Sequence, residues 1–126
     1  MQLNLEHPDH EFLLRGADGR IAVVNDRQLN SSFILAPDRL VEAWPVQDPR
    51  ALVAGDLEAL LGLDPEVVLL GTGAAQVFPP ASVMAYCMER GIGIEVMANA
   101  AAARTFNVLA SEGRRVVAGF ILQPAP

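Results

Sequence analysis

Short apolar runs separated by turn-forming residues are the main pattern of this chain, and the clearest run is Val67-Val68-Leu69-Leu70. Pro65 precedes this run, and the glycine pair Gly71 and Gly73 follows it. Four consecutive apolar residues between such breakers are typical of a strand buried on both faces, as in the middle of a parallel or mixed sheet. We therefore expect this segment to be the central strand of the fold.

After residue 73 the pattern changes to alternating helices and strands. Pro79-Pro80 suits the entry to a helix, where a missing N–H group costs little. Gly91 and Gly113 stand where helices are expected to end. In chain order the pattern predicts a helix over 81–90, a strand over 92–97, a helix over 100–111 with Asn99 as its N-cap, and a strand over 116–122.

The first half of the chain has the pattern of a β-meander. Glycine-bounded residues 16–19 separate two apolar runs, as in a hairpin. A strand that ends at Pro45 shows alternating apolar and polar positions. Asp56 and Gly62 bracket one short helix as N-cap and stop. The predicted strands are 12–14, 21–24, 30–35 and 39–44, and the predicted helix is 56–61.

Together these elements predict an α/β fold in a single domain over residues 1–126. A strand–helix–strand unit from 67 to 97 favours a right-handed crossover between parallel strands. The direction of the last strand stays open. Residues 1–11 have no periodic apolar face, so we expect a solvated terminal segment there.

Composition and charge exclude several classes of partner. The chain is 52% hydrophobic and 19% charged, which indicates a well-formed core. Its net charge is −6, and residues 1–66 hold twelve acidic residues against five arginines. Nucleic acid and anionic membrane surfaces are therefore poor partners, because both attract positive charge. No apolar run approaches the ~20 residues of a membrane span, and the first residues contain no signal pattern, so we expect a cytoplasmic protein without membrane insertion.

Cysteine and histidine do not indicate a metal or redox centre. Cys87 is the only cysteine and falls in an apolar helical stripe, which favours a buried core residue over a reactive thiol. His7 and His10 lie among acidic residues, but Pro8 interrupts them and nothing rigidifies the segment. We therefore predict neither a metal site nor a cofactor.

The segment Gly71-Thr72-Gly73 after the central strand suggests a phosphate-binding loop. Glu95, on the next strand, stands near where a ribose-binding acid would lie. Gln76 replaces the third glycine, however, and Pro79-Pro80 begins the helix far from the glycine pair. A bound phosphate would then miss the helix N-terminus. The alternative interpretation is that the glycines release the strand into a tight loop.

One polar face of the helix over 100–111 is a second candidate site. Arg104, Asn107 and Ser111 share this face, with Thr105 beside them. They could bind an anion or a partner, or they could form a hydrogen-bond network between helix and sheet. In the binding interpretation, this face, Glu95 and the Gly71–Gly73 loop converge at one edge of the sheet.

Several motifs in this order resemble the Mth938-domain family, which includes bacterial Xcc1710-like proteins of unknown function and is similar to mitochondrial complex I assembly factor 3. The motifs cover most of the chain from about Phe12 to Leu122. They are NSSFILAP at 30–37, EAW at 42–44, GTGAAQVFPP at 71–80, GIGIEVM at 91–97 and AAARTFNVLASEGRRVVAGFI at 101–121. The chain departs from the usual family pattern at Ala98-Asn99, where an acidic residue and threonine are usual, and at Phe106, where tyrosine is common.

The resemblance implies a single three-layer domain, in which a mixed central sheet has helices on both faces and the N-terminal β-meander packs against it. It also implies a role in assembling a respiratory membrane complex through protein contacts. No catalytic residue or cofactor carries over from the family.

Two functions follow from these observations. No set of acid, base and nucleophile indicates an enzyme, so we favour a non-catalytic protein-interaction role such as complex I assembly, with an unidentified protein partner. The alternative is a domain that binds a nucleotide or anionic metabolite, or an enzyme of unrecognised type, using the loop after the central strand. The candidate residues under either hypothesis are Gly71, Thr72, Gly73, Glu95, Arg104, Thr105 and Asn107.

Overall fold

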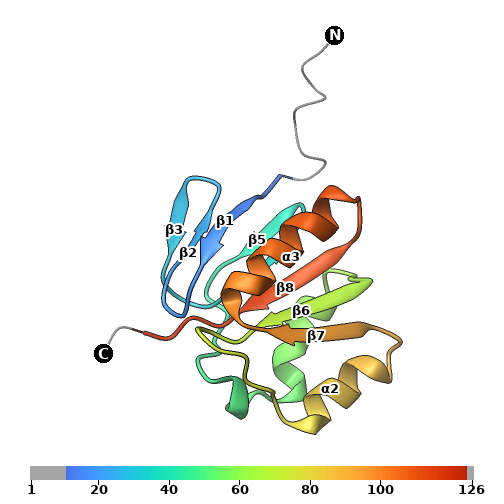
Figure 1. Ribbon diagram of the computed structural model, residues 1–126. Coiled ribbons are helices and arrows are strands. Elements are labelled where there is room, and N and C mark those ends of the chain that lie inside the picture. The colour runs from blue at the N-terminus through green and yellow to red at the C-terminus, as the bar shows by residue number, and fades with distance from the viewer. Residues whose placement is uncertain (1–10, 125–126) are drawn as a thin grey trace.

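A five-stranded mixed sheet forms the centre of the computed structural model, which describes residues 11–124 (Figure 1). The strand order is β5-β4-β8-β6-β7. The five strands are β4 (Phe33–Ala36), β5 (Arg39–Val41), β6 (Val67–Gly71), β7 (Gly93–Met97) and β8 (Val116–Phe120).

The apolar run at Val67 is the inner strand β6, as predicted, and all five of its residues are buried. It pairs in parallel with β7 on one side and with β8 on the other. The last strand, whose direction the sequence left open, is therefore parallel to β6. Because β4 pairs antiparallel with both β5 and β8, the sheet is mixed.

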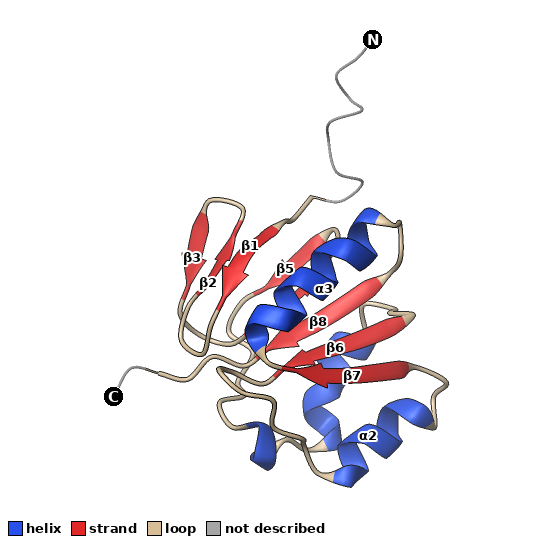
Figure 2. Cartoon of the chain, viewed as in Figure 1, coloured by secondary structure: helices blue, strands red, loops and turns tan. Residues whose placement is uncertain are grey.

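Helices cover both faces of this sheet, as predicted (Figure 2). Alternate residues of β6 point to opposite faces. Leu69 belongs to the core shared with α3 (Asn99–Ser111). Leu70 belongs to the opposite core, which includes residues of α1 (Glu58–Leu61), α2 (Ala81–Met88) and the 3₁₀ helix η3 (Ala54–Leu57). Leu52, directly after the 3₁₀ helix η2 (Pro49–Ala51), also belongs to it. The result is the expected three-layer α/β fold.

The N-terminal β-meander forms a separate three-stranded sheet that packs on the α3 side. It consists of β1 (Leu14–Ala17), β2 (Ala22–Val24) and β3 (Arg27–Leu29), each antiparallel to the next. The sequence pattern missed β3, because two of its three residues are exposed and polar. The predicted strand over 30–35 is shorter, begins at Phe33 and belongs to the central sheet as β4.

The predicted strand over 39–44 is also too long. It ends at Val41, since Ala43 has a φ of +63°, which does not continue a strand. This turn directs Trp44 into the core, where its indole N–H donates to the carbonyl of Asp56 (3.1 Å). Asp56 itself is not the N-cap of a helix. It lies inside η3, where its carboxylate accepts from the amide of Val53 (2.9 Å).

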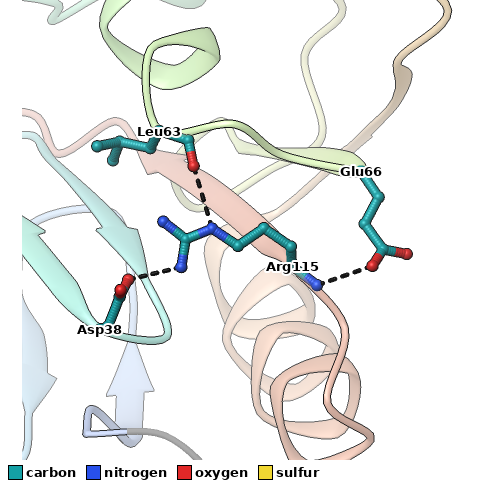
Figure 3. Close-up of polar contacts among 4 residues, drawn as sticks. All are labelled: Asp38, Leu63, Glu66 and Arg115. Carbon is teal, nitrogen blue, oxygen red and sulfur yellow. Dashed lines mark hydrogen bonds and ion pairs between the residues drawn. The ribbon is translucent and has the colours of Figure 1, made fainter.

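Arg115 connects three segments at the start of β8 (Figure 3). Its guanidinium lies 2.6 Å from Asp38 in the β4–β5 turn and donates to the carbonyl of Leu63 (3.0 Å). Its backbone amide donates to Glu66, just before β6 (3.1 Å). The Arg115 hydrogen bond lowers the pKa of Asp38. Two hydrogen bonds lower the pKa of Glu66: the one from the Arg115 amide has the larger effect, and the one from the Arg114 guanidinium has the smaller.

Removing the Arg115 charge should weaken the acid dependence of stability. The pKa of Asp38 is lowered in the folded state, so its stabilising effect is present above its unfolded pKa near 4 and is lost as pH falls through the lower folded value. Asp38 is exposed, so we expect this effect to be below about 1 kcal/mol. Urea unfolding at pH 7 and pH 3 measures this effect. Between these two pH values the free energy of unfolding should fall less in Arg115→Met than in the wild type.

Arg50→Met is the matched control for this measurement. Arg50 is exposed, and its guanidinium forms no ion pair within residues 11–124. The change in the free energy of unfolding of Arg50→Met between pH 7 and pH 3 should match that of the wild type. An Arg115→Met variant with a wild-type pH profile would show that the Asp38 pair does not stabilise the fold.

Candidate functional site

The carboxyl ends of β6, β7 and β8 meet at one edge of the central sheet, because these three strands are parallel. The chain leaves β6 toward α2 on one face and leaves β7 toward α3 on the other face (Figure 1). In open α/β sheets a crevice at such a reversal is the usual place for a ligand. The predicted loop Gly71–Gly73 lies at this edge.

A cleft of about 760 Å³ is present at this edge. Its volume is in the range of small-molecule sites. Three segments line it: the β1–β2 turn at residues 18–21, the loop after β6 at Thr72, Ala74, Ala75 and Val77, and the segment after β8 at Gln123 and Pro124. Of the seven predicted candidate residues, only Thr72 lines this cleft.

The polar side chains of the loop after β6 bond to the backbone of the loop itself and of β7. The hydroxyl of Thr72 donates to the carbonyl of Ala75 (2.7 Å) and accepts from the amide of Val77 (3.0 Å). Gln76 donates from its side-chain amide to the carbonyl of Val96 on β7 (2.8 Å). Gly73 has a φ of +103°, which few other residues adopt easily. These contacts favour the tight-loop interpretation of the glycine motif.

Gly71 is required for close packing against Asn99, a residue whose role sequence reasoning missed. A Cβ on residue 71 would collide with the side-chain oxygen of Asn99 and would lie 3.1 Å from the ring of Phe120. Asn99 is completely buried at the first position of α3. Its Oδ1 accepts no hydrogen bond from the described residues. The glycine therefore provides room for an asparagine, not for a phosphate.

The amide nitrogen of the Asn99 side chain joins two other segments to α3. It donates to the carbonyl of Asp18 (2.8 Å) and to the carbonyl of Ile121 (3.0 Å). The predicted N-cap role is therefore wrong, because the side chain points into the core and Ala98 occupies the cap position. The backbone N–H of Asn99 donates to Gly73 (2.8 Å). No local sequence signal identifies these contacts.

Asn107 is part of a helix–sheet network, the alternative left open by the sequence. Its Oδ1 accepts from the amide of Leu14 (3.0 Å), and its Nδ2 donates to the carbonyl of the same residue (2.7 Å). One side chain thus pairs with the backbone of β1 as a neighbouring strand would. This amide is occupied, so it does not face a ligand.

The remaining candidate residues do not gather at the cleft. Glu95 is exposed on β7, Arg104 is exposed on α3, and Thr105 is half-buried. Neither Glu95 nor Arg104 forms an ion pair within residues 11–124. The expected convergence of this helix face with Glu95 and the glycine loop is therefore not observed.

Two charged residues line the cleft, Asp18 and Arg20. The amides of Arg20 and Ile21 donate to Asp18 Oδ1, each at 2.8 Å, and these hydrogen bonds lower the pKa of Asp18. Asp18 is thus charged at neutral pH. The cleft is suited to a small polar molecule, but its charged residues do not form an acid–base pair with a nucleophile.

Cys87 lies on α2 and is fully buried in the core, and burial raises the pKa of its thiol. This agrees with its predicted structural role. Across residues 11–124, no three His, Cys, Asp or Glu side chains lie close enough together to hold a metal ion. The predictions about His7 and His10 fall outside the described residues. Among the described helices, none has the length and apolar character needed to cross a membrane.

The family described as "Protein of unknown function (DUF498/DUF598)" matches residues 15–121. Several solved structures share the fold. XCC1710 of Xanthomonas campestris is 57% identical, with a TM-score of 0.82 over 97% of this chain and 92% of that one. A Mth938-like domain of Bordetella pertussis is 28% identical, with a TM-score of 0.75 over 98% and 94%. A protein of Bartonella henselae described as an outer membrane protein is 26% identical, with a TM-score of 0.76 over 92% and 98%.

Curated relatives include a membrane protein and two assembly factors. The "13 kDa major membrane protein" of Francisella tularensis is 28% identical over 75% of this chain and 77% of its own length. NADH dehydrogenase (ubiquinone) 1 alpha subcomplex assembly factor 3 of Bos taurus is 32% identical over 82% of this chain, and that of Danio rerio is 37% identical over 65%. The chain spans about half the length of these two proteins, 56% and 48% respectively.

The network interpretation of Asn107 predicts a large difference between two neighbouring substitutions on α3. Asn107→Ala removes both hydrogen bonds to Leu14 and leaves backbone groups without a partner, so we expect a loss of about 1–3 kcal/mol in the free energy of unfolding. Arg104→Ala, on the exposed face, should change it by less than about 0.5 kcal/mol. Urea unfolding measures both. An Asn107→Ala variant with the free energy of unfolding of the wild type would rule out the structural role.

Proposed function

This chain belongs to the DUF498/DUF598 family of proteins of unknown function, and we propose that it is a non-catalytic protein-interaction factor in the assembly of respiratory complex I. The observation that carries this proposal is the match to the two NADH dehydrogenase assembly factors, one of which aligns with 106 residues of this chain. The protein partner is an assembly intermediate or another assembly factor of that complex. We place this role in the cytoplasm.

The chemistry of the candidate site supports an interaction role over catalysis. Thr72, Asn99 and Asn107 have polar side chains suited to a ligand, yet all three are bonded to the protein backbone. An enzyme needs groups free to touch a substrate or to move a proton. Thr72 instead closes the loop after β6, and the two asparagines hold the β1–β2 turn and β1 against α3.

Exposed apolar residues near the cleft also support protein contact. Phe78 follows the cleft residue Val77 and is 63% exposed, and Ile21 in the β1–β2 turn is 37% exposed. Large aromatic side chains on a surface are typical anchors of protein interfaces. Little of the Phe78 side chain is buried in the isolated chain, and a partner that covers it would explain this exposure.

A second candidate function is the binding of a small polar molecule in the cleft at the carboxyl edge. The cleft volume of about 760 Å³ and its place in the topology favour this candidate. The ligand class would be a nucleotide or an anionic metabolite that contacts Arg20 and the amides of the loop after β6.

Deletion of the gene in its native host should reduce the amount of fully assembled complex I on native gels, and the wild-type gene should restore it. Phe78→Asp should restore it poorly, because a charge replaces an apolar anchor. Met88→Asp is the matched control, since Met88 is equally exposed (67%) but lies at the far end of α2. A deletion strain with normal complex I would overturn the assembly role.

Thermal melting of the purified protein separates the two candidates. A ligand at 100 times its dissociation constant adds about 2.7 kcal/mol of stability. The interaction role predicts no shift of Tm with phosphate, AMP or citrate. A shift that Ala75→Trp abolishes by filling the cleft would favour the small-molecule function.

A further inference from the structure

Strand β7 forms an outer edge of the central sheet and pairs on one side only, with β6. Figure 2 shows it as the outermost strand of the central sheet, and α2 is the helix that lies next to it. The free side of an edge strand presents unpaired backbone N–H and C=O groups, which can hydrogen-bond to an added strand.

The register identifies which backbone groups face outward. Thr72 donates its amide to the carbonyl of Met97, so the backbone of Met97 faces β6. Backbone groups alternate in direction along a strand, so Ile94 and Val96 face away from the sheet. Gln76 confirms this direction, because its side chain reaches the carbonyl of Val96 from outside the β6–β7 ladder (2.8 Å). Within the described part of the chain, the backbone of Ile94 and the amide of Val96 have no partner.

Glu95 gives this edge a charge. Its side chain is exposed, and no described cation pairs with it. It lies between the two outward-facing residues, so it meets the middle of any strand added there. Opposite charges on facing residues stabilise a strand pair, and like charges destabilise it.

We propose that the β7 edge binds an extended segment of a partner protein as an added strand, with a basic residue of that segment opposite Glu95. This proposal rests on the proposed interaction role and names the chemistry of the partner. Gln76 acts as a removable cover, because its amide occupies the Val96 carbonyl until the partner's backbone replaces it.

The charge of Glu95 also argues against a second copy of this chain as the occupant. Two β7 strands paired antiparallel about a twofold axis centred on Glu95 would match Ile94 with Val96 of the other copy. The two Glu95 residues would then face each other in the narrow, non-hydrogen-bonded pair. A net charge of −6 on each chain adds to this repulsion.

Two capped seven-residue peptides test the proposal on the intact protein. Each alternates threonine and valine, and the central residue is arginine in one and glutamate in the other. In ¹H–¹⁵N NMR titrations, the arginine peptide should produce saturable shifts at the amides of Ile94 and Val96. It should bind at least about threefold more tightly than the glutamate peptide. The Glu95→Arg variant should reverse the preference.

Substitutions along the edge provide the controls. Ile94→Pro removes one outward N–H group and no bond to β6, so the fold should be retained and peptide binding lost. Ile94→Val should bind like the wild type. Gln76→Ala should bind more tightly, because it exposes the Val96 carbonyl.

Three outcomes would overturn the proposal. These are no saturable shift with either peptide up to about 5 mM, equal binding of the two peptides, or concentration-dependent shifts of the same amides without peptide, which would identify a second copy as the occupant. If the peptides fail to bind while the deletion strain still lacks complex I, the edge proposal is wrong and the assembly role remains.

Discussion

The close approach of Gly71 and Asn99 is the contact on which the carboxyl edge of this sheet depends. Asn99 is buried where the loop after β6, the β1–β2 turn and the end of β8 come together, and its side chain bonds to the last two. It fits only because residue 71 has no side chain. An edge that holds ligands in other α/β proteins is here used to attach the N-terminal sheet to the central sheet.

This constraint explains why the glycine motif misleads. A glycine pair after a buried strand resembles a phosphate loop, because both need a backbone free of side chains. Here one glycine makes room for Asn99, and the other takes a positive φ that turns the chain. Thr72, between them, holds the loop closed through Ala75 and Val77. The polar atoms of the motif are thus used within the protein, and the surface beside it is left for contact with other molecules.

The central part of the fold could be predicted from the sequence because its signals are local. Val67–Leu70 is uniformly apolar, and Pro79-Pro80 and Gly91 bound α2 closely. The site could not be predicted, because its contacts join residues far apart in the chain. Asn99 and Asp18 are 81 residues apart, and Asn107 and Leu14 are 93 apart. The helical pattern shows that Asn107 faces away from the core stripe. It does not show that the backbone of β1 lies opposite this side chain. β3 was missed for a different reason, since a short polar edge strand has no hydrophobic pattern.

A double-mutant cycle between Gly71 and Asn99 tests most directly whether this edge is built for structure. Gly71→Ala should lower the free energy of unfolding by about 1–3 kcal/mol through overpacking, whereas Gly93→Ala, in open space on β7, should not. Asn99→Ala should also destabilise the protein, because it removes two buried hydrogen bonds. In the double variant the losses should be clearly less than additive, since the new methyl group gains the space of the lost amide. Fully additive losses, or a Gly71→Ala variant as stable as the wild type, would contradict this account.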